Sequence, residues 1–180
     1  MTRYVMVIDT RTCIGCGDCV VACKTENKVP DGLNRDWVVE LTRGTYPDLY
    51  TEFRSERCNH CSHATCAYSC PTGASHFWQD SNIVLVEPSQ CTGCKACIAA
   101  CPYDARLAMH PEGYIDKCTF CHHRVEKGLD PACVSTCPTH CMHFGAADDP
   151  SSRVARLLRT RKSKALMPET GNRPNVFFLE

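Results

Sequence analysis

The chain has 180 residues, enough for one domain or two small ones. Seventeen cysteines make up over nine per cent of it, the range in which a disulfide scaffold or a metal protein is expected. The net charge is zero, although residues 151–180 carry seven Lys/Arg against two Asp/Glu. No run approaches the roughly 20 apolar residues of a membrane span, and no nucleic-acid recognition motif is present. We therefore expect neither a membrane span nor nucleic-acid binding.

A short strand is predicted before the first cysteine group. Residues 4–8 are apolar and β-rich, which favours a strand. The group that follows has the C-x2-C-x2-C-x3-C spacing that holds cubane iron–sulfur clusters in bacterial ferredoxins. Its members are Cys13, Cys16, Cys19 and Cys23. Lys24 stands where proline is usual in this motif, so we expect the helix that begins at Cys19 to continue through Thr25.

Residues 24–57 contain no cysteine. Two β-rich segments, 37–41 and 49–53, flank a turn that contains glycine and proline, which predicts a hairpin or a partly ordered arm. An ordinary insertion loop is the alternative. Trp37 and Tyr46 fit local packing and partner docking equally well.

Two further cysteine groups surround a second predicted hairpin. Group two consists of Cys58, Cys61, Cys66 and Cys70, and group three consists of Cys91, Cys94, Cys97 and Cys101. Residues 74–78 and 83–86 are β-rich and flank a polar turn, which predicts the hairpin. In group three, Gly93 lets the backbone turn without a Cβ in the way, so that its N–H groups can face a cluster.

The fourth group leads into the basic tail. Its members are Cys118, Cys121, Cys133 and Cys137. Cys141, four residues later, is interpreted as a small buried side chain rather than an extra ligand. Ser151 or Ser152 is expected to cap a helix over residues 153–159, whose arginines form a solvated face on a docking helix rather than a membrane-surface helix. Residues 173–179 are extended and apolar, and we expect them to pack on their own globule or on a partner.

The four cysteine groups form an internal repeat, and three of them end in Cys-Pro. The repeat predicts an α+β, loop-rich fold made of two bacterial dicluster ferredoxin-like halves, with short β-hairpins and short helices. Chain order pairs group two with group three in residues 58–101, and group one with group four in residues 1–23 plus 102–150. Residues 24–57 are then an inserted hairpin arm, and residues 151–180 a basic helix with an extended docking tail.

Sixteen cysteines supply four complete ligand sets, which predicts four [4Fe–4S] clusters. In two-cluster ferredoxins the fourth cysteine of a motif ligates the other cluster, and we apply this exchange as a hypothesis. The first set is then Cys13, Cys16, Cys19 and Cys137, and the second is Cys118, Cys121, Cys133 and Cys23. The third set is Cys58, Cys61, Cys66 and Cys101, and the fourth is Cys91, Cys94, Cys97 and Cys70.

The predicted chemistry is electron transfer without catalysis. A cluster held by four cysteines has no open coordination position for a substrate, and no Ser/His/Asp set, phosphate loop or carboxylate pair stands out. Lys24, Lys95 and Lys117 flank ligand cysteines and either raise local reduction potentials or lie at the surface. A zinc-binding structural module is the remote alternative, because zinc sites usually pair two C-x2-C units and need no further cysteines.

With all four groups in view, the chain resembles the iron–sulfur subunits of respiratory molybdopterin oxidoreductases of the dimethyl sulfoxide reductase family. It is similar in particular to polysulfide, thiosulfate and tetrathionate reductase subunits. The matching motifs are Arg57-Cys-Asn-His-Cys61, Cys70-Pro-Thr-Gly-Ala74, Cys101-Pro-Tyr-Asp-Ala-Arg106, Lys117-Cys-Thr-Phe-Cys121 and Arg173-Pro-Asn-Val-Phe-Phe-Leu179. The chain departs from the pattern at Thr139-His-Cys141, where Thr-Gly-Ala is common.

The resemblance implies a role and a place in the cell. Four [4Fe–4S] clusters would relay electrons between a polytopic quinone-interacting membrane subunit and a molybdopterin catalytic subunit in anaerobic respiration. The chain would lie peripherally on the cytoplasmic membrane, on the periplasmic face through a Tat-exported partner, with the cytoplasmic face as the alternative. Its start has neither a twin arginine nor a secretory apolar region. The alternative function is a cytosolic polyferredoxin-like subunit of a hydrogenase or formate dehydrogenase.

Overall fold

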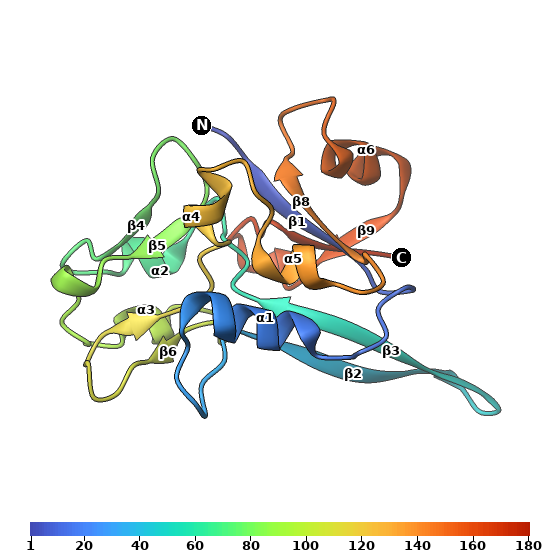
Figure 1. The fold of residues 1–180 in the computed structure, drawn as a ribbon, viewed down its shortest axis with the longest axis horizontal. Coiled ribbons are helices and arrows are strands. Elements are labelled where there is room, and N and C mark those ends of the chain that lie inside the picture. Colours follow the sequence, from blue (N-terminus) through green and yellow to red (C-terminus); the bar gives the residue numbers. More distant parts are fainter.

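A four-stranded sheet joins the two ends of the chain. In a computed structural model that describes residues 1–180, the strand order of this sheet is β8-β1-β10-β9. The strands are β1 (Tyr4–Asp9), β8 (Met142–Ala146), β9 (Ser163–Ala165) and β10 (Val176–Leu179). β1 pairs antiparallel with β8 and parallel with β10, so the first and last strands lie side by side (Figure 1). The predicted first strand is confirmed, and the apolar tail packs on its own globule.

β1 is buried on both faces because its side chains alternate between two cores. Met6 and Ile8 belong to the main core, which also contains most of the buried cysteines. Val5 and Val7 face a smaller core with Val154 of α6 (Arg153–Thr160). All four of these β1 side chains are fully buried. The strand therefore separates the cysteine-rich part of the molecule from the tail helix.

Helix α6 has the cap and the packing that the sequence predicts. Ser152 is its N-cap, and the hydroxyl oxygen accepts a hydrogen bond from the backbone N–H of Ala155 at 3.1 Å. The helix packs on β1 and β8 of its own chain, and Arg156 and Arg159 are exposed. The basic face is therefore solvated in this chain.

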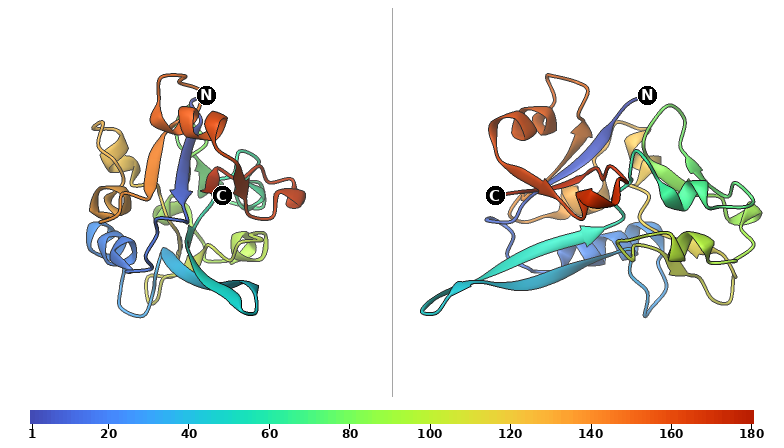
Figure 2. Two further views of the ribbon diagram at one scale, coloured as in Figure 1. Left: turned by 90° about the vertical axis from the view of Figure 1, so that its right-hand side faces the viewer. Right: turned by 180° about the vertical axis from the view of Figure 1, so that it is seen from behind.

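The longest hairpin projects from the body of the molecule (Figure 2). β2 (Asp36–Thr45) and β3 (Asp48–Arg57) pair along their whole length, which confirms the predicted hairpin. The two aromatic residues whose role the sequence leaves open, Trp37 and Tyr46, have different environments. Trp37 is half-buried against the main core at the base, whereas Tyr46 is 89% exposed at the tip.

The remaining elements are short, so the fold is α+β and loop-rich. The predicted hairpin after group two is confirmed as β4 (Ser75–Phe77) and β5 (Val84–Val86), and β6 (Leu107–Ala108) pairs with β7 (Ile115–Asp116). The other helices are α1 (Asp18–Asn27), α2 (Thr65–Tyr68), α3 (Ala96–Ala99), α4 (His122–Val125) and α5 (Ala132–Thr136). None of the helices combines the length and the apolar character that crossing a membrane requires.

Helix length follows the residue after the fourth cysteine. α2, α3 and α5 each end just before a Cys-Pro pair and are four or five residues long. α1 continues past Cys23 to Asn27, because Lys24 keeps a backbone N–H and has no ring to clash with the preceding turn. The predicted extension through Thr25 is confirmed.

Candidate electron-transfer sites

The four cysteine loops share one backbone turn. The residue two positions after the first cysteine has a positive φ in every group. These residues are Gly15 (71°), His60 (42°), Gly93 (66°) and Phe120 (50°). The sequence repeat is therefore also a repeat of backbone conformation, and the turn predicted at Gly93 is confirmed.

Glycine is needed at two of these turns for a further reason. A Cβ on Gly15 would lie 2.5 Å from the ring of Phe53, and one on Gly93 would clash with the carbonyl oxygen of Gly113. At the other two turns the side chains pack on each other, because the rings of His60 and Phe120 stack with centroids 3.7 Å apart. The loops of groups two and four thus meet at the centre of the molecule.

Site A is the first predicted ligand set. It consists of Cys13, Cys16, Cys19 and Cys137. All four cysteines line one cavity with an empty volume of about 300 Å³, between the group-one loop and the end of α5. α1 packs on α5, which brings cysteines more than 100 residues apart to the same space.

Site B is the second predicted ligand set. It consists of Cys23, Cys118, Cys121 and Cys133, all of which are buried. These cysteines also line one cavity, again with an empty volume of about 300 Å³. Asn27, Asp36, Arg57 and Thr119 form the polar part of its wall. Cys19 and Cys23 lie on the same helix but line different cavities.

Site C is the third predicted ligand set. It consists of Cys58, Cys61, Cys66 and Cys101. Burial raises the pKa of Cys61 to about 12, and negative charge on Cys58, Cys66 and Cys101 acts in the same direction. Cys66 packs against the small core cluster that contains Cys61, and the charges of Cys58 and Cys101 also act on Cys61.

Site D is the fourth predicted ligand set. It consists of Cys70, Cys91, Cys94 and Cys97. Burial raises the pKa of Cys97, Arg106 opposes that shift, and the charge of Cys70 adds to it. Cys97 therefore lies near Cys70, and α2 packs on α3. Cys91 and Cys94 are the outer members, half-exposed and exposed in the loop before α3.

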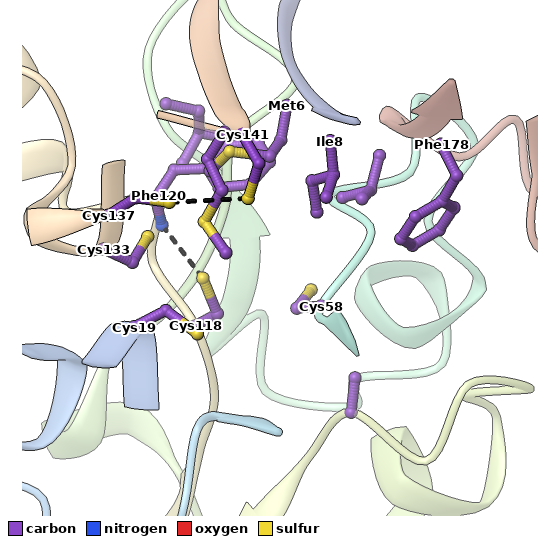
Figure 3. Close-up of a cluster of buried hydrophobic side chains, with 14 of the residues drawn as sticks. Met6, Ile8, Cys19, Cys58, Cys118, Phe120, Cys133, Cys137, Cys141 and Phe178 are labelled. Carbon is purple, nitrogen blue, oxygen red and sulfur yellow. Dashed lines mark hydrogen bonds between the residues drawn. The ribbon is translucent and has the colours of Figure 1, made fainter. Parts of the chain in front are cut away.

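The four sites follow one another in the order A, B, C, D. Burial raises the pKa of Cys133 in site B to about 11, and the charge of Cys19 in site A contributes to this shift. Burial also raises the pKa of Cys118 in site B, with a contribution from Cys58 in site C. Figure 3 shows Cys19 and Cys133 near Cys118, with Cys58 on its other side.

Sites C and D are neighbours as well, and the most exposed cysteines lie at the two ends of the row. The charge of Cys66 in site C contributes to the raised pKa of Cys97 in site D, after burial and the opposing Arg106. Cys16 in site A and Cys94 in site D are the exposed cysteines of the chain. Every cysteine of site B is buried, whereas Cys66 and Cys101 of site C are half-exposed, so site B is the part of the row that is shielded from solvent.

The residues around the sites fit iron–sulfur clusters. No three His, Cys, Asp or Glu side chains converge closely enough to hold a single metal ion, whereas a cubane keeps its four thiolates further apart than one zinc ion does. Buried N–H donors of Arg57 and Arg106 have no acceptor in the protein. Cluster sulfides would satisfy such donors, and all seventeen cysteines are free of disulfide bonds.

Cys141 is buried, as predicted, and it contacts site A. Its Sγ lies 3.4 Å from the Sγ of Cys137, and it lines the same cavity (Figure 3). A hydrogen bond from the Cys141 thiol lowers the pKa of Cys13 to about 6. The pKa of Cys141 is raised by the same bond, so this side chain is a thiol donor beside two predicted ligands.

The three lysines that the sequence singles out have different environments. Lys117 is fully buried between sites B and C, whereas Lys95 is exposed. Lys24 donates hydrogen bonds to the carbonyl oxygens of Pro30 and Leu33 and closes a loop. Sequence reasoning missed the burial of Arg57 and Arg106. A signal existed for one of them, because Arg57 and Lys117 both directly precede the first cysteine of a group.

Comparison with known proteins gives the class of the chain. Two family models, each described as a 4Fe-4S dicluster domain, match residues 49–147 and residues 12–75. The chain belongs to the 4Fe-4S dicluster domain family. It binds [4Fe–4S] clusters, and its fold is the predicted one.

Curated relatives narrow the class. The arsenate respiratory reductase iron-sulfur subunit ArrB of Shewanella sp. is 35% identical over 98% of this chain and 96% of that protein. A tetrathionate reductase subunit of Salmonella typhimurium is 42% identical over 98% and 72%. A putative dimethyl sulfoxide reductase iron-sulfur subunit of Halobacterium salinarum is 37% identical over 99% and 79%. The chain is thus an iron–sulfur electron-transfer subunit of a reductase complex, and not its catalytic subunit.

Proposed function

We propose that the chain holds four [4Fe–4S] clusters and relays electrons between a quinone-interacting membrane subunit and a molybdopterin catalytic subunit. The observation that carries the proposal is the row of sites A to D, whose two exposed cysteines, Cys16 and Cys94, lie at its ends and whose site B is wholly buried. The similarity to subunits of tetrathionate, arsenate and dimethyl sulfoxide reductases supports the respiratory setting.

The clusters would supply one-electron chemistry, and the chain supplies their order and surroundings. The sixteen cysteines of sites A to D are the proposed ligands, divided between two ferredoxin-like halves. α1 and α5 place the ligands of sites A and B, and α2 and α3 place those of sites C and D. A chain of this length is roughly 40 Å across, so four sites within it are close neighbours. The four cysteines of site B are buried, which excludes water from that part of the row.

The proposal includes a location. The chain would lie at the cytoplasmic membrane through its partner subunit, on the periplasmic face after export together with a Tat-signalled catalytic subunit. The named relatives support a complex with other subunits, because each is itself named as a subunit.

Purification of the tagged chain from membranes of the organism that makes it would test this function. We expect molybdenum and a polytopic membrane protein to copurify, and a quinol analogue to bleach the iron–sulfur absorption of the complex. Protease protection in intact spheroplasts would decide the side of the membrane. A soluble complex that contains nickel, or one that no quinol reduces, would contradict the proposal and favour the polyferredoxin-like alternative.

A further inference from the structure

Three cationic side chains are buried among the cysteine sites. Arg57, Arg106 and Lys117 are 2%, 6% and 1% exposed. Burial of a charge is unfavourable unless other charges or hydrogen bonds compensate. Arg57 lies 3.8 Å from the carboxylate of Asp36, and neither Arg106 nor Lys117 forms an ion pair with Asp or Glu. Something else must compensate these charges.

Arg57 lies at the junction of sites A and B. Its Nη1 donates to the Sγ of Cys133 in site B at 3.0 Å. Its Nη2 donates to the hydroxyl of Ser55, and that hydroxyl lies 3.4 Å from the Sγ of Cys19 in site A. One guanidinium therefore reaches a ligand of each site, directly on one side and through a serine on the other.

Arg106 lies at the junction of sites C and D in a similar arrangement. Its Nη2 donates to the hydroxyl of Ser75 at 2.7 Å, and the backbone N–H of Ser75 donates to the Sγ of Cys70 in site D at 3.4 Å. Its Nε and Nη1 are buried without an acceptor in the protein. Burial lowers the pKa of Arg106, but negative charge on Cys66, Cys58 and Cys97 outweighs this, so its pKa is raised.

Lys117 lies at the remaining junction, between sites B and C. Its Nζ donates to the carbonyl oxygens of Val84 and of Cys118, the latter at 2.7 Å. Burial lowers the pKa of Lys117, and negative charge at Cys58 in site C and Cys118 in site B opposes this. Each junction in the row thus holds one buried cationic side chain.

We propose that Arg57, Lys117 and Arg106 are positioning residues for electron transfer, each raising the reduction potentials of the two clusters that it separates. This inference rests on the proposed function, because it assumes clusters in sites A to D. Reduction adds negative charge to a cubane held by thiolates, and a fixed positive charge beside it stabilises the reduced form. The effect falls with distance, so the two adjacent clusters respond most. The cations also weaken the repulsion between neighbouring reduced clusters.

The test is an anaerobic redox titration of the cluster-loaded protein, followed by electron paramagnetic resonance. Arg106→Gln is expected to lower the reduction potentials of clusters C and D. At a fixed solution potential, the ratio of reduced to oxidised cluster should fall at least tenfold, which corresponds to 59 mV for one electron. Arg57→Gln should shift clusters A and B in the same way, and Lys117→Met should shift clusters B and C. Clusters outside each pair should keep their potentials.

Two controls separate charge from structure. Arg106→Lys keeps the positive charge, so the reduction potentials of clusters C and D should stay close to those of the unmodified chain. Lys95→Gln removes an exposed cation beside Cys94 and should shift site D far less, because water and salt screen it. Iron and sulfide content must match the unmodified chain in every variant. If Arg57→Gln fails to assemble because Asp36 loses its partner, Arg106→Gln, which has no carboxylate partner, decides the question.

The outcomes for this inference and for the proposed function are distinct. Fully loaded variants whose potentials do not move, or in which all four clusters shift equally, would overturn the tuning role and leave the relay intact. Fewer than four clusters in the unmodified chain would instead overturn the proposed function.

Discussion

Removal of iron and sulfide is expected to unfold the chain rather than to leave an empty fold. Six of the fifteen residues in the main core are cysteines, and the short helices around them are too short to be stable alone. Metal binding contributes on the order of 10 kcal/mol in small domains that depend on it, comparable with the whole stability of a typical domain. We expect cooperative thermal unfolding, followed by far-ultraviolet circular dichroism, to disappear after anaerobic treatment with chelator and reductant.

Reconstitution is the control for this result. Iron and sulfide added back anaerobically should restore the transition, which would exclude irreversible damage to the thiols. The smaller core of β1, α6 and β10 contains no cysteine, so any structure that survives should lie there. A cluster-free chain that keeps a full cooperative transition would show that the apolar contacts are sufficient without the clusters.

Cys19→Ala and Cys23→Ala are expected to remove different clusters, although both residues lie on α1. Cys19 lines the cavity of site A and Cys23 lines that of site B. Two double variants test this, in which Cys121→Ala is combined with either Cys19→Ala or Cys23→Ala. Cys121 belongs to site B, so only one of the two pairs lies within a single predicted ligand set. The pair with Cys23→Ala should lose no more [4Fe–4S] signal than either single variant. The pair with Cys19→Ala should lose about twice as much.

Electron paramagnetic resonance and iron content would measure these losses. Cys141→Ala is the matched control, since this buried cysteine lies outside the four sets and should keep all the iron. If ligands were not exchanged between groups one and four, Cys19 and Cys23 would belong to the same cluster, and Cys23→Ala combined with Cys121→Ala would also lose about twice the signal of a single variant.

Local features of the sequence predicted most of the individual elements. The αL turn at Gly93, both predicted hairpins, the Ser152 cap and the extension of α1 past Lys24 depend on neighbouring residues, so a local pattern suffices. The parallel pairing of β1 with β10 could not be predicted in this way, because it joins residues about 170 positions apart. The sequence left open whether the apolar tail would pack on its own chain or on a partner.

The burial of the three cationic side chains could not be predicted from the sequence. Arginine and lysine are almost never fully buried without a partner, so Lys24, Lys95 and Lys117 were indistinguishable in the sequence. Only the fold shows that Lys117 lies between two thiol sites while Lys95 faces solvent. No local pattern predicts the burial of Arg106, because the serine that it contacts is 31 residues away in the sequence.

The number of clusters can be measured directly as iron and acid-labile sulfide per chain in anaerobically purified protein. About sixteen of each are expected, with a broad brown absorption that bleaches on reduction, because four cubanes contain four irons and four sulfides each. About eight of each would mean that only half of the sites hold clusters. Zinc without sulfide would contradict the electron relay altogether.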